Sequence, residues 1–240
     1  MSVNVSWNPD GKPWLLDAAM VDLDGTMVDT LGDFVEAVNR MFAELAMPAM
    51  APEQVERMVG KGTEHLIRCA LRAAHSNAAS TPAELEQWVQ ANFERAHQLY
   101  MQHYLAINGT HAQTYAGVAQ GLQALKAAGV RLACVTNKPL AFTTPLLAAK
   151  GLDGLFDAVF GGDSFARKKP DPLPLLATCE CLGTTPQRTL MIGDSSNDAQ
   201  AARAAGCPVV LVSYGYNHGE SAHTVDADGV VDSIAHIAVV

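Results

Sequence analysis

Apolar positions divide the chain into a short first run, a long helical stretch, and an alternation of runs and helices. The first run is Ala18–Val21, four consecutive apolar residues that predict a buried strand. From Asp33 to about Tyr104, apolar residues recur every three or four positions, which predicts helices and no strand. The individual helices are expected over residues 33–47, 52–71 and 82–104.

Beyond about Ile107 the pattern changes to alternating helices and short apolar runs. Strands are predicted over residues 130–136, 158–160, 189–193, 208–212 and 229–231. Helices are predicted over residues 118–128, 139–150, 172–182 and 198–205. Such alternation predicts an α/β fold with a parallel sheet covered on both faces by helices. The helical stretch is then an insertion after the first strand, with residues 1–31 and 106–240 forming the core and residues 32–105 the insertion.

Composition narrows the class of protein. The 240 residues are 49% hydrophobic and carry a net charge of −9, so a basic surface for nucleic acid or anionic membranes is not expected. No apolar run is long enough to cross a bilayer, and the first fifteen residues lack the apolar centre of a signal peptide. We therefore expect a cytoplasmic protein. Its five scattered cysteines predict buried free thiols rather than a metal site.

Two carboxylates follow the first strand directly. Asp22 and Asp24 are two residues apart, so both point to the same side of an extended chain. The simplest alternative is a solvated turn, because Asp and Gly are common turn residues. If the pair lies at the carboxyl end of a parallel sheet, however, two like charges share one small site. A divalent cation would then offset the repulsion between the two carboxylates.

Polar residues follow two later strands as well. Thr136 and Asn137 stand just before a helix and could grip an oxyanion, although a helix cap is the competing interpretation for Asn137. Asp194 and Asp198 follow the strand over residues 189–193. Helix capping explains Asp198, but it does not require Asp194, which favours a metal ligand there.

One dense basic cluster precedes the helix over residues 172–182. Basic runs are usually solvated, but a site holding several carboxylates and a phosphate needs a cation beside it. Of the cluster Arg167-Lys168-Lys169, we expect Lys169 in the site because Pro170 stiffens the backbone next to it.

Four segments together resemble the ordered motifs of the haloacid dehalogenase-like hydrolase superfamily, and the likeness covers nearly the whole chain after about residue 15. The segments are Asp22-Leu23-Asp24-Gly25-Thr26, Val135-Thr136-Asn137, Lys169-Pro170 and Gly193-Asp194-Ser195-Ser196-Asn197-Asp198. The resemblance implies a Rossmann-like, doubly wound parallel sheet as the core, with the insertion as an all-helical cap.

The resemblance also implies roles for these residues. Asp22 would be the nucleophile that forms an aspartyl-phosphate, and Asp24 the general acid and base. Mg²⁺ would be held by the Asp22 carboxylate, the Asp24 backbone carbonyl and Asp194. Asp198 would support the metal shell or Lys169, while Thr136, Asn137 and Lys169 would hold the phosphoryl oxygens.

An acid two residues after the nucleophile favours phosphoryl transfer over carbon–halogen cleavage. Within the phosphatases, residues 25–30, the helical cap and residues 133–139 look most like the phosphoglycolate phosphatase branch. Branches acting on sugar phosphates such as N-acetylmuramic acid 6-phosphate, or on pyrophosphate, share these features, as does a phosphoglucomutase branch. A binding protein without catalysis is the alternative from another class. The partner would be a small phosphorylated metabolite, with a monomer or a homodimer both open.

Substrate choice is expected to lie in the cap. In Gly60-Lys61-Gly62 the glycines would let the backbone approach a small ligand, and Lys61 could pair with a carboxylate such as that of glycolate. A helix end or a turn that merely exposes the lysine is an equal alternative. Arg57 and Arg68 are weaker candidates, because cationic side chains on amphipathic helices usually extend into solvent.

Overall fold

A six-stranded parallel sheet forms the centre of the molecule in the computed structural model, which describes residues 2–7, 13–75 and 81–240. The strand order is β10-β9-β8-β3-β6-β7, and every neighbouring pair is parallel. The strands are β3 (Ala18–Val21), β6 (Arg131–Val135), β7 (Ala158–Phe160), β8 (Thr189–Gly193), β9 (Val209–Val212) and β10 (Gly229–Val231). This confirms the predicted α/β fold with its parallel sheet.

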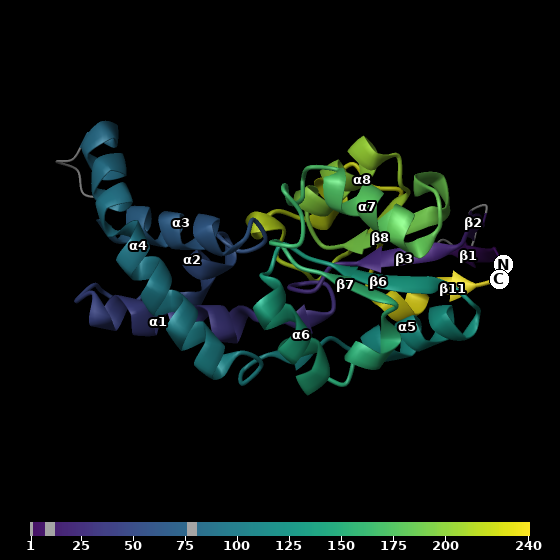
Figure 1. Ribbon diagram of the computed structural model, residues 1–240, viewed down its shortest axis with the longest axis horizontal. Helices are drawn as coiled ribbons and strands as arrows, with labels where there is room; N and C mark the ends of the chain where they lie inside the picture. Colours follow the sequence, from purple (N-terminus) through teal and green to yellow (C-terminus); the bar gives the residue numbers. More distant parts are fainter. Residues whose placement is uncertain (1, 8–12, 76–80) are drawn as a thin grey trace.

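Helices cover both faces of this sheet (Figure 1), and apolar side chains of the strands are buried under them on each face. Helices α5 (Val118–Ala127) and α6 (Leu140–Ala149) lie on one face, and α7 (Leu173–Leu182) and α8 (Ser196–Ala205) on the other. All four residues of β3 are buried, as a central parallel strand requires.

The register of β3 brings three strand ends together. Val21 is aligned with Cys134 of β6 and with Ile192 of β8. The residues that follow these strands therefore emerge at the same edge of the sheet, where open α/β sheets bind their ligands.

In the described part of the chain, four helices between residues 30 and 108 form a separate layer at that edge (Figure 1). They are α1 (Leu31–Glu44), α2 (Pro52–Glu56), α3 (Thr63–His75) and α4 (Pro82–Ile107). Their facing side chains form an apolar cluster of their own, which includes Phe42, Ile67 and Tyr100. We call this layer the cap.

The prediction of one helix over residues 52–71 was wrong, because the structure has two helices there. Gly60 and Gly62 adopt φ values of 101° and 90°, a conformation that no right-handed helix contains. The spacing of apolar residues in the sequence continues across this break, so the spacing alone predicted a single helix. A loop is predicted over residues 74–80; helix α3 extends to His75, and residues 76–80 lie outside the described part of the chain.

The two connections between cap and core lie side by side. Strand β4 (Val28–Asp29), before α1, pairs with β5 (Gln113–Thr114), after α4. The buried Asp33 carboxylate of α1 also accepts hydrogen bonds from the backbone N–H groups of Gly109 (2.7 Å) and His111 (2.8 Å). The division into two domains at residues 31/32 and 105/106 stays a prediction.

A second small sheet joins the two ends of the chain and was not predicted. Strand β1 (Val3–Ser6) pairs with β2 (Trp14–Leu16) and with β11 (Ala238–Val239), both antiparallel. The Trp7 and Trp14 rings stack beside it with centroids 5.5 Å apart. Among the described residues, no helix is long and apolar enough to span a membrane.

Candidate active site

Three buried carboxylates meet at the ends of β3 and β8. Oxygen atoms of Asp22, Asp194 and Asp198 all lie within 4.8 Å of one another, and each residue is at most 8% exposed. Burial is the main cause that raises the pKa of Asp22 to about 6, against the opposing effect of Lys169. Burial, followed by the nearby Asp198 and Asp22 carboxylates, raises the pKa of Asp194 well above its ordinary value.

This cluster fits a hard divalent cation. Carboxylate oxygens are the ligands that Mg²⁺ prefers, and packed acids without a cation repel one another. Asp22 Oδ1 is buried and makes no hydrogen bond with suitable geometry. Its charged neighbour is the Lys169 ammonium 3.0 Å away, so a cation bound here would share this oxygen with Lys169. The third carboxylate of the cluster is that of Asp198, not that of Asp24. Asp24 is expected to bind the cation through its backbone carbonyl instead.

Lys169 balances part of this charge. Its ammonium nitrogen lies 3.0 Å from Asp22 Oδ1 and 2.7 Å from Asp198 Oδ1, and it also donates to the Val135 carbonyl at 2.6 Å. The side chain of its neighbour Arg167 is 67% exposed and pairs with Asp171 instead. Of the basic cluster, the structure therefore brings Lys169 into the site as expected.

Asp198 combines the two roles that the sequence left open. Its Oδ2 accepts hydrogen bonds from the backbone N–H groups of Asp194 and Ser195 and from the Ser195 hydroxyl, which orders the start of α8. Its Oδ1 holds Lys169. The carboxylate thus supports the loop that carries Asp194 and orients the lysine.

Gly25 explains why the first turn can approach the second acidic loop so closely. Its φ is +81°, and a Cβ there would lie 2.5 Å from Asp194 Oδ2. The carboxylate is also anchored from two sides, since it accepts from the Tyr216 backbone N–H (2.8 Å) and the Thr26 hydroxyl (3.2 Å).

Asp24 has different neighbours from Asp22. Its Oδ1 accepts hydrogen bonds from the Thr30 hydroxyl at 2.8 Å and from the Lys138 ammonium at 3.0 Å. Lys138 is only 4% exposed and also donates to the Tyr104 hydroxyl of α4. Lys138 was not among the predicted site residues, although it directly follows Thr136 and Asn137.

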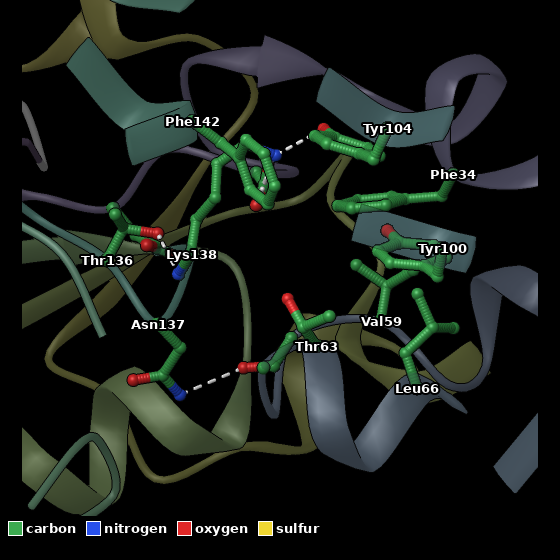
Figure 2. Close-up of a pocket in the computed structure, with 14 residues that line it drawn as sticks. Phe34, Val59, Thr63, Leu66, Tyr100, Tyr104, Thr136, Asn137, Lys138 and Phe142 are labelled. Carbon is green, nitrogen blue, oxygen red and sulfur yellow. Dashed lines mark hydrogen bonds and ion pairs between the residues drawn. The ribbon is translucent and has the colours of Figure 1, made fainter. Parts of the chain in front are cut away.

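A small pocket of about 30 Å³ opens between these side chains and the cap (Figure 2). Asp22, Asp24, Thr136 and Lys138 line it from the core. The cap side is mostly apolar, with Val59, Leu66 and aromatic rings. The rings come from Phe34, Tyr100 and Tyr104 of the cap and from Phe142 of α6.

The loop between α2 and α3 closes this pocket through its backbone. The Gly60 carbonyl accepts hydrogen bonds from the side-chain amides of Asn137 (3.0 Å) and Asn197 (3.2 Å). Gly60 and Gly62 line the pocket, as the close approach predicted for the glycines requires. Lys61 is exposed and is not among the residues lining the pocket.

Asn137 therefore connects elements instead of pointing a free amide at the pocket. Besides Gly60, its Nδ2 donates to the Lys169 carbonyl at 2.8 Å. Thr136 and Asn137 both line the pocket, and the Thr136 hydroxyl accepts from the Lys138 backbone N–H at 3.2 Å. A role of either residue in binding phosphate stays a prediction.

Comparisons with known proteins agree with this geometry. The family model described as haloacid dehalogenase-like hydrolase matches residues 19–212. The chain is 42% identical to a phosphoglycolate phosphatase of Thiobacillus denitrificans, over 94% of this chain and 96% of that protein. It is 43% identical to one of Nitrosospira multiformis, over 92% and 94%. The crystal structure of a predicted phosphoglycolate phosphatase from Haemophilus somnus superposes with a TM-score of 0.83 at 33% identity, covering 92% of this chain and 95% of that one.

Proposed function

The chain belongs to the haloacid dehalogenase-like hydrolase family and is a phosphoric monoester hydrolase, and from this we propose that it hydrolyses 2-phosphoglycolate by a magnesium-dependent, two-step mechanism. One observation carries the mechanism. Asp22 and Asp24 line the same pocket, but Asp22 belongs to the acidic cluster with Lys169, whereas Asp24 lies against Lys138 and Thr30. Two carboxylates in such different surroundings suit two different tasks.

In the first step the Asp22 carboxylate attacks phosphorus. A bond forms between Asp22 oxygen and phosphorus, the bond from phosphorus to the leaving oxygen breaks, and Asp24 gives its proton to that oxygen. Glycolate leaves and Asp22 carries the phosphoryl group. The closed pocket keeps bulk water away from the reacting atoms.

In the second step Asp24 acts as a base. It takes a proton from a water molecule whose oxygen attacks phosphorus, and the bond between Asp22 and phosphorus breaks. Inorganic phosphate leaves, and both carboxyl groups return to their starting states. The Thr30 hydroxyl holds the Asp24 side chain in place during both transfers.

The acidic cluster would hold Mg²⁺ through Asp22 and Asp194, with Asp198 beside them. When bound, the cation offsets the negative charge of the carboxylates and the phosphoryl group. Lys169 already lies beside the Asp22 oxygen, which supports its role in stabilising the transferring phosphoryl group together with Thr136.

The pocket supports a small leaving group. Its volume of about 30 Å³ is little more than a few water molecules require, and aromatic rings close the cap side. A two-carbon leaving group suits this space better than a sugar does.

Phosphate release from four substrates, with and without Mg²⁺, tests the proposal. We expect the highest kcat/KM with 2-phosphoglycolate, lower values with ethyl phosphate and an aryl phosphate, and the lowest with glucose 6-phosphate. Asp22→Asn should reduce release by about 10³-fold or more.

Three results would contradict this. Release without added or bound metal would reject the magnesium dependence, and full activity in Asp22→Asn would reject the nucleophile. Phosphate retained on an isomeric sugar would identify a mutase instead.

A further inference from the structure

The pocket contains a single cation among its described lining residues. Asp22 and Asp24 supply negative charge to it, and Lys138 supplies the positive charge. Lys169 does not line the pocket, and its ammonium contacts Asp22, Asp198 and the Val135 carbonyl. Lys138 does line it, with its ammonium against Asp24 and the Tyr104 hydroxyl. An anionic group that enters the pocket beside the phosphate therefore meets Lys138, whereas the Lys168 ammonium lies next to Gly62 without lining the pocket.

The surroundings of Lys138 make its charge effective. Its ammonium lies 4.7 Å from the centroid of the Phe34 ring and 4.5 Å from that of the Tyr104 ring. Tyr104 in turn packs edge-on against Phe142, with centroids 4.9 Å apart. Aromatic rings attract the cation and exclude water, so a carboxylate brought to this place would interact with it strongly.

The position of Lys138 relates it to one end of the substrate. The lysine pairs with Asp24, the residue that protonates the leaving oxygen, and not with Asp22 or the acidic cluster. Lys138 therefore lies on the leaving-group side, while Lys169 lies on the phosphoryl side. In glycolate the carboxylate carbon is bonded to the carbon that bears the leaving oxygen, so a group near Asp24 has that carboxylate within reach.

A hydroxyl faces the same space from the cap. Figure 2 shows Thr63, at the start of α3, pointing into the pocket toward the side that Lys138 occupies. A carboxylate has two oxygens, and an ammonium with a hydroxyl would serve both.

We infer that Lys138 determines specificity by binding the carboxylate of the leaving group. The inference rests on the proposed function and names the residue that distinguishes 2-phosphoglycolate from neutral phosphate monoesters. It differs from the expectation for Lys61, which is exposed and does not line the pocket.

Three substrates separate this role from others in Lys138→Met. They are 2-phosphoglycolate, ethyl phosphate (in which a methyl group replaces the carboxylate) and p-nitrophenyl phosphate (whose leaving group needs no proton). We expect the ratio of kcat/KM for 2-phosphoglycolate to that for ethyl phosphate to fall by about 30-fold or more. Lys126→Met is the matched control, since the Lys126 ammonium bonds backbone carbonyls of Gly154 and Leu155 away from the pocket, and it should leave the ratio unchanged.

Each of the following patterns of change in kcat/KM would overturn the inference. Equal losses for 2-phosphoglycolate and ethyl phosphate, with p-nitrophenyl phosphate spared, would mean that Lys138 only positions Asp24. Equal losses for all three would mean a structural role. A ratio that falls in Lys61→Met but not in Lys138→Met would assign the carboxylate to Lys61.

The same data distinguish failure of the proposed function from failure of the inference about Lys138. If the wild-type enzyme does not prefer 2-phosphoglycolate to ethyl phosphate, the substrate proposal fails together with the inference. If the wild type shows the preference and Lys138→Met retains it, only the inference fails.

Two further measurements guard against a folding defect. Lys138→Arg keeps the charge, so it should retain more of the substrate ratio than Lys138→Met does. Calorimetry on Asp22→Asn with Mg²⁺ should show 2-phosphoglycolate binding, and adding Lys138→Met should weaken it by about 30-fold. Unchanged affinity in the folded double variant would overturn the inference.

Discussion

Buried charge is the dominant feature at the residue scale. Four carboxylates, Asp22, Asp24, Asp194 and Asp198, are buried close to two lysines, Lys138 and Lys169. If all are ionised, two negative charges remain uncompensated, which equals the charge of one Mg²⁺. Since buried charge without a partner is costly, the folded protein and the cation should stabilise each other.

Asp194→Asn should therefore reduce the stabilisation by Mg²⁺. At a Mg²⁺ concentration of 100 times Kd, the wild type gains about 2.7 kcal/mol, and the variant at the same concentration should gain clearly less. Thermal unfolding with and without Mg²⁺ measures this. Asp153→Asn, at an exposed position remote from the strand ends, is the control. An equal rise in Tm for all three proteins would exclude Asp194 as a ligand.

Lys169→Met should destabilise the metal-free protein. Removing the ammonium leaves Asp22 and Asp198 buried without their cation, a loss of about 3–5 kcal/mol. Urea unfolding measures the change. Arg203→Met is the comparison, because Arg203 pairs with Asp226 and Asp228 near the surface and should contribute about 1 kcal/mol or less. Similar losses of unfolding free energy in both variants would show that the buried ion pairs of Lys169 contribute no more than those of Arg203 near the surface.

Site residues could be predicted where the local sequence pattern determines their position. Asp22 and Asp194 follow from strand ends that share one sheet edge, and Lys169 follows from the basic cluster beside Pro170, together with known motif order. Lys138 was missed because a lysine before Pro139 in a loop is usually solvated. It is buried here because Phe34 of α1 and Tyr104 of α4 pack over it, and no local pattern reveals how the cap is placed.

At the element scale, the α2–α3 loop fastens the cap to the core. Gly60 offers a backbone carbonyl to Asn137, just after β6, and to Asn197, in the first turn of α8. His218, from the loop after β9, lies against Gly60 as well, since a Cβ there would be 3.3 Å from His218 Cε1. Closure of the cap thus depends on main-chain contacts at a glycine.

Asn197→Ala should loosen this closure. Losing one neutral hydrogen bond costs about 1 kcal/mol, which predicts a KM about 5-fold higher. Hydrogen exchange of residues 57–62 should become faster. Asn92→Ala is the control, because Asn92 bonds only the Trp88 carbonyl within α4 among the interactions described. Unchanged exchange in this loop would mean that the Gly60 carbonyl does not hold the cap.

Secondary structure was predictable where elements are long or strongly apolar. The predicted helix over residues 82–104 closely matches α4, and the central strands match within about two residues. Strands β1, β2 and β11 have two to four residues each and were not predicted. Their pairing also joins opposite ends of the chain, which no local pattern can indicate.

At the scale of the whole molecule, three apolar clusters surround one active site. The cap has its own cluster of buried side chains, and the sheet has one on each face. The chain passes between cap and core next to the β4–β5 pair, where Asp33 holds Gly109 and His111.

Asp33→Ala should weaken the junction between cap and core. It leaves two N–H groups without their carboxylate, and hydrogen bonds to charged groups contribute about 1.5–3 kcal/mol each. Urea unfolding followed by aromatic fluorescence should show a loss of about 3–6 kcal/mol for the two bonds together. Glu36→Ala, on the exposed side of the same helix and paired only with Arg40 among the described contacts, should cost far less. Equal losses of unfolding free energy in the two variants would show that the Asp33 hydrogen bonds do not stabilise the junction between cap and core.

The small sheet that joins β1 to β11 has a practical consequence. It brings both termini to the end of the molecule away from the cap (Figure 1), and the Val240 backbone N–H donates to the Asn4 carbonyl at 3.0 Å. An affinity tag, a fluorophore or a tether to a surface can therefore be attached at either terminus while the pocket faces solution. A dye at the C-terminus paired with one on an exposed cap position such as Glu86 would then report cap motion during turnover.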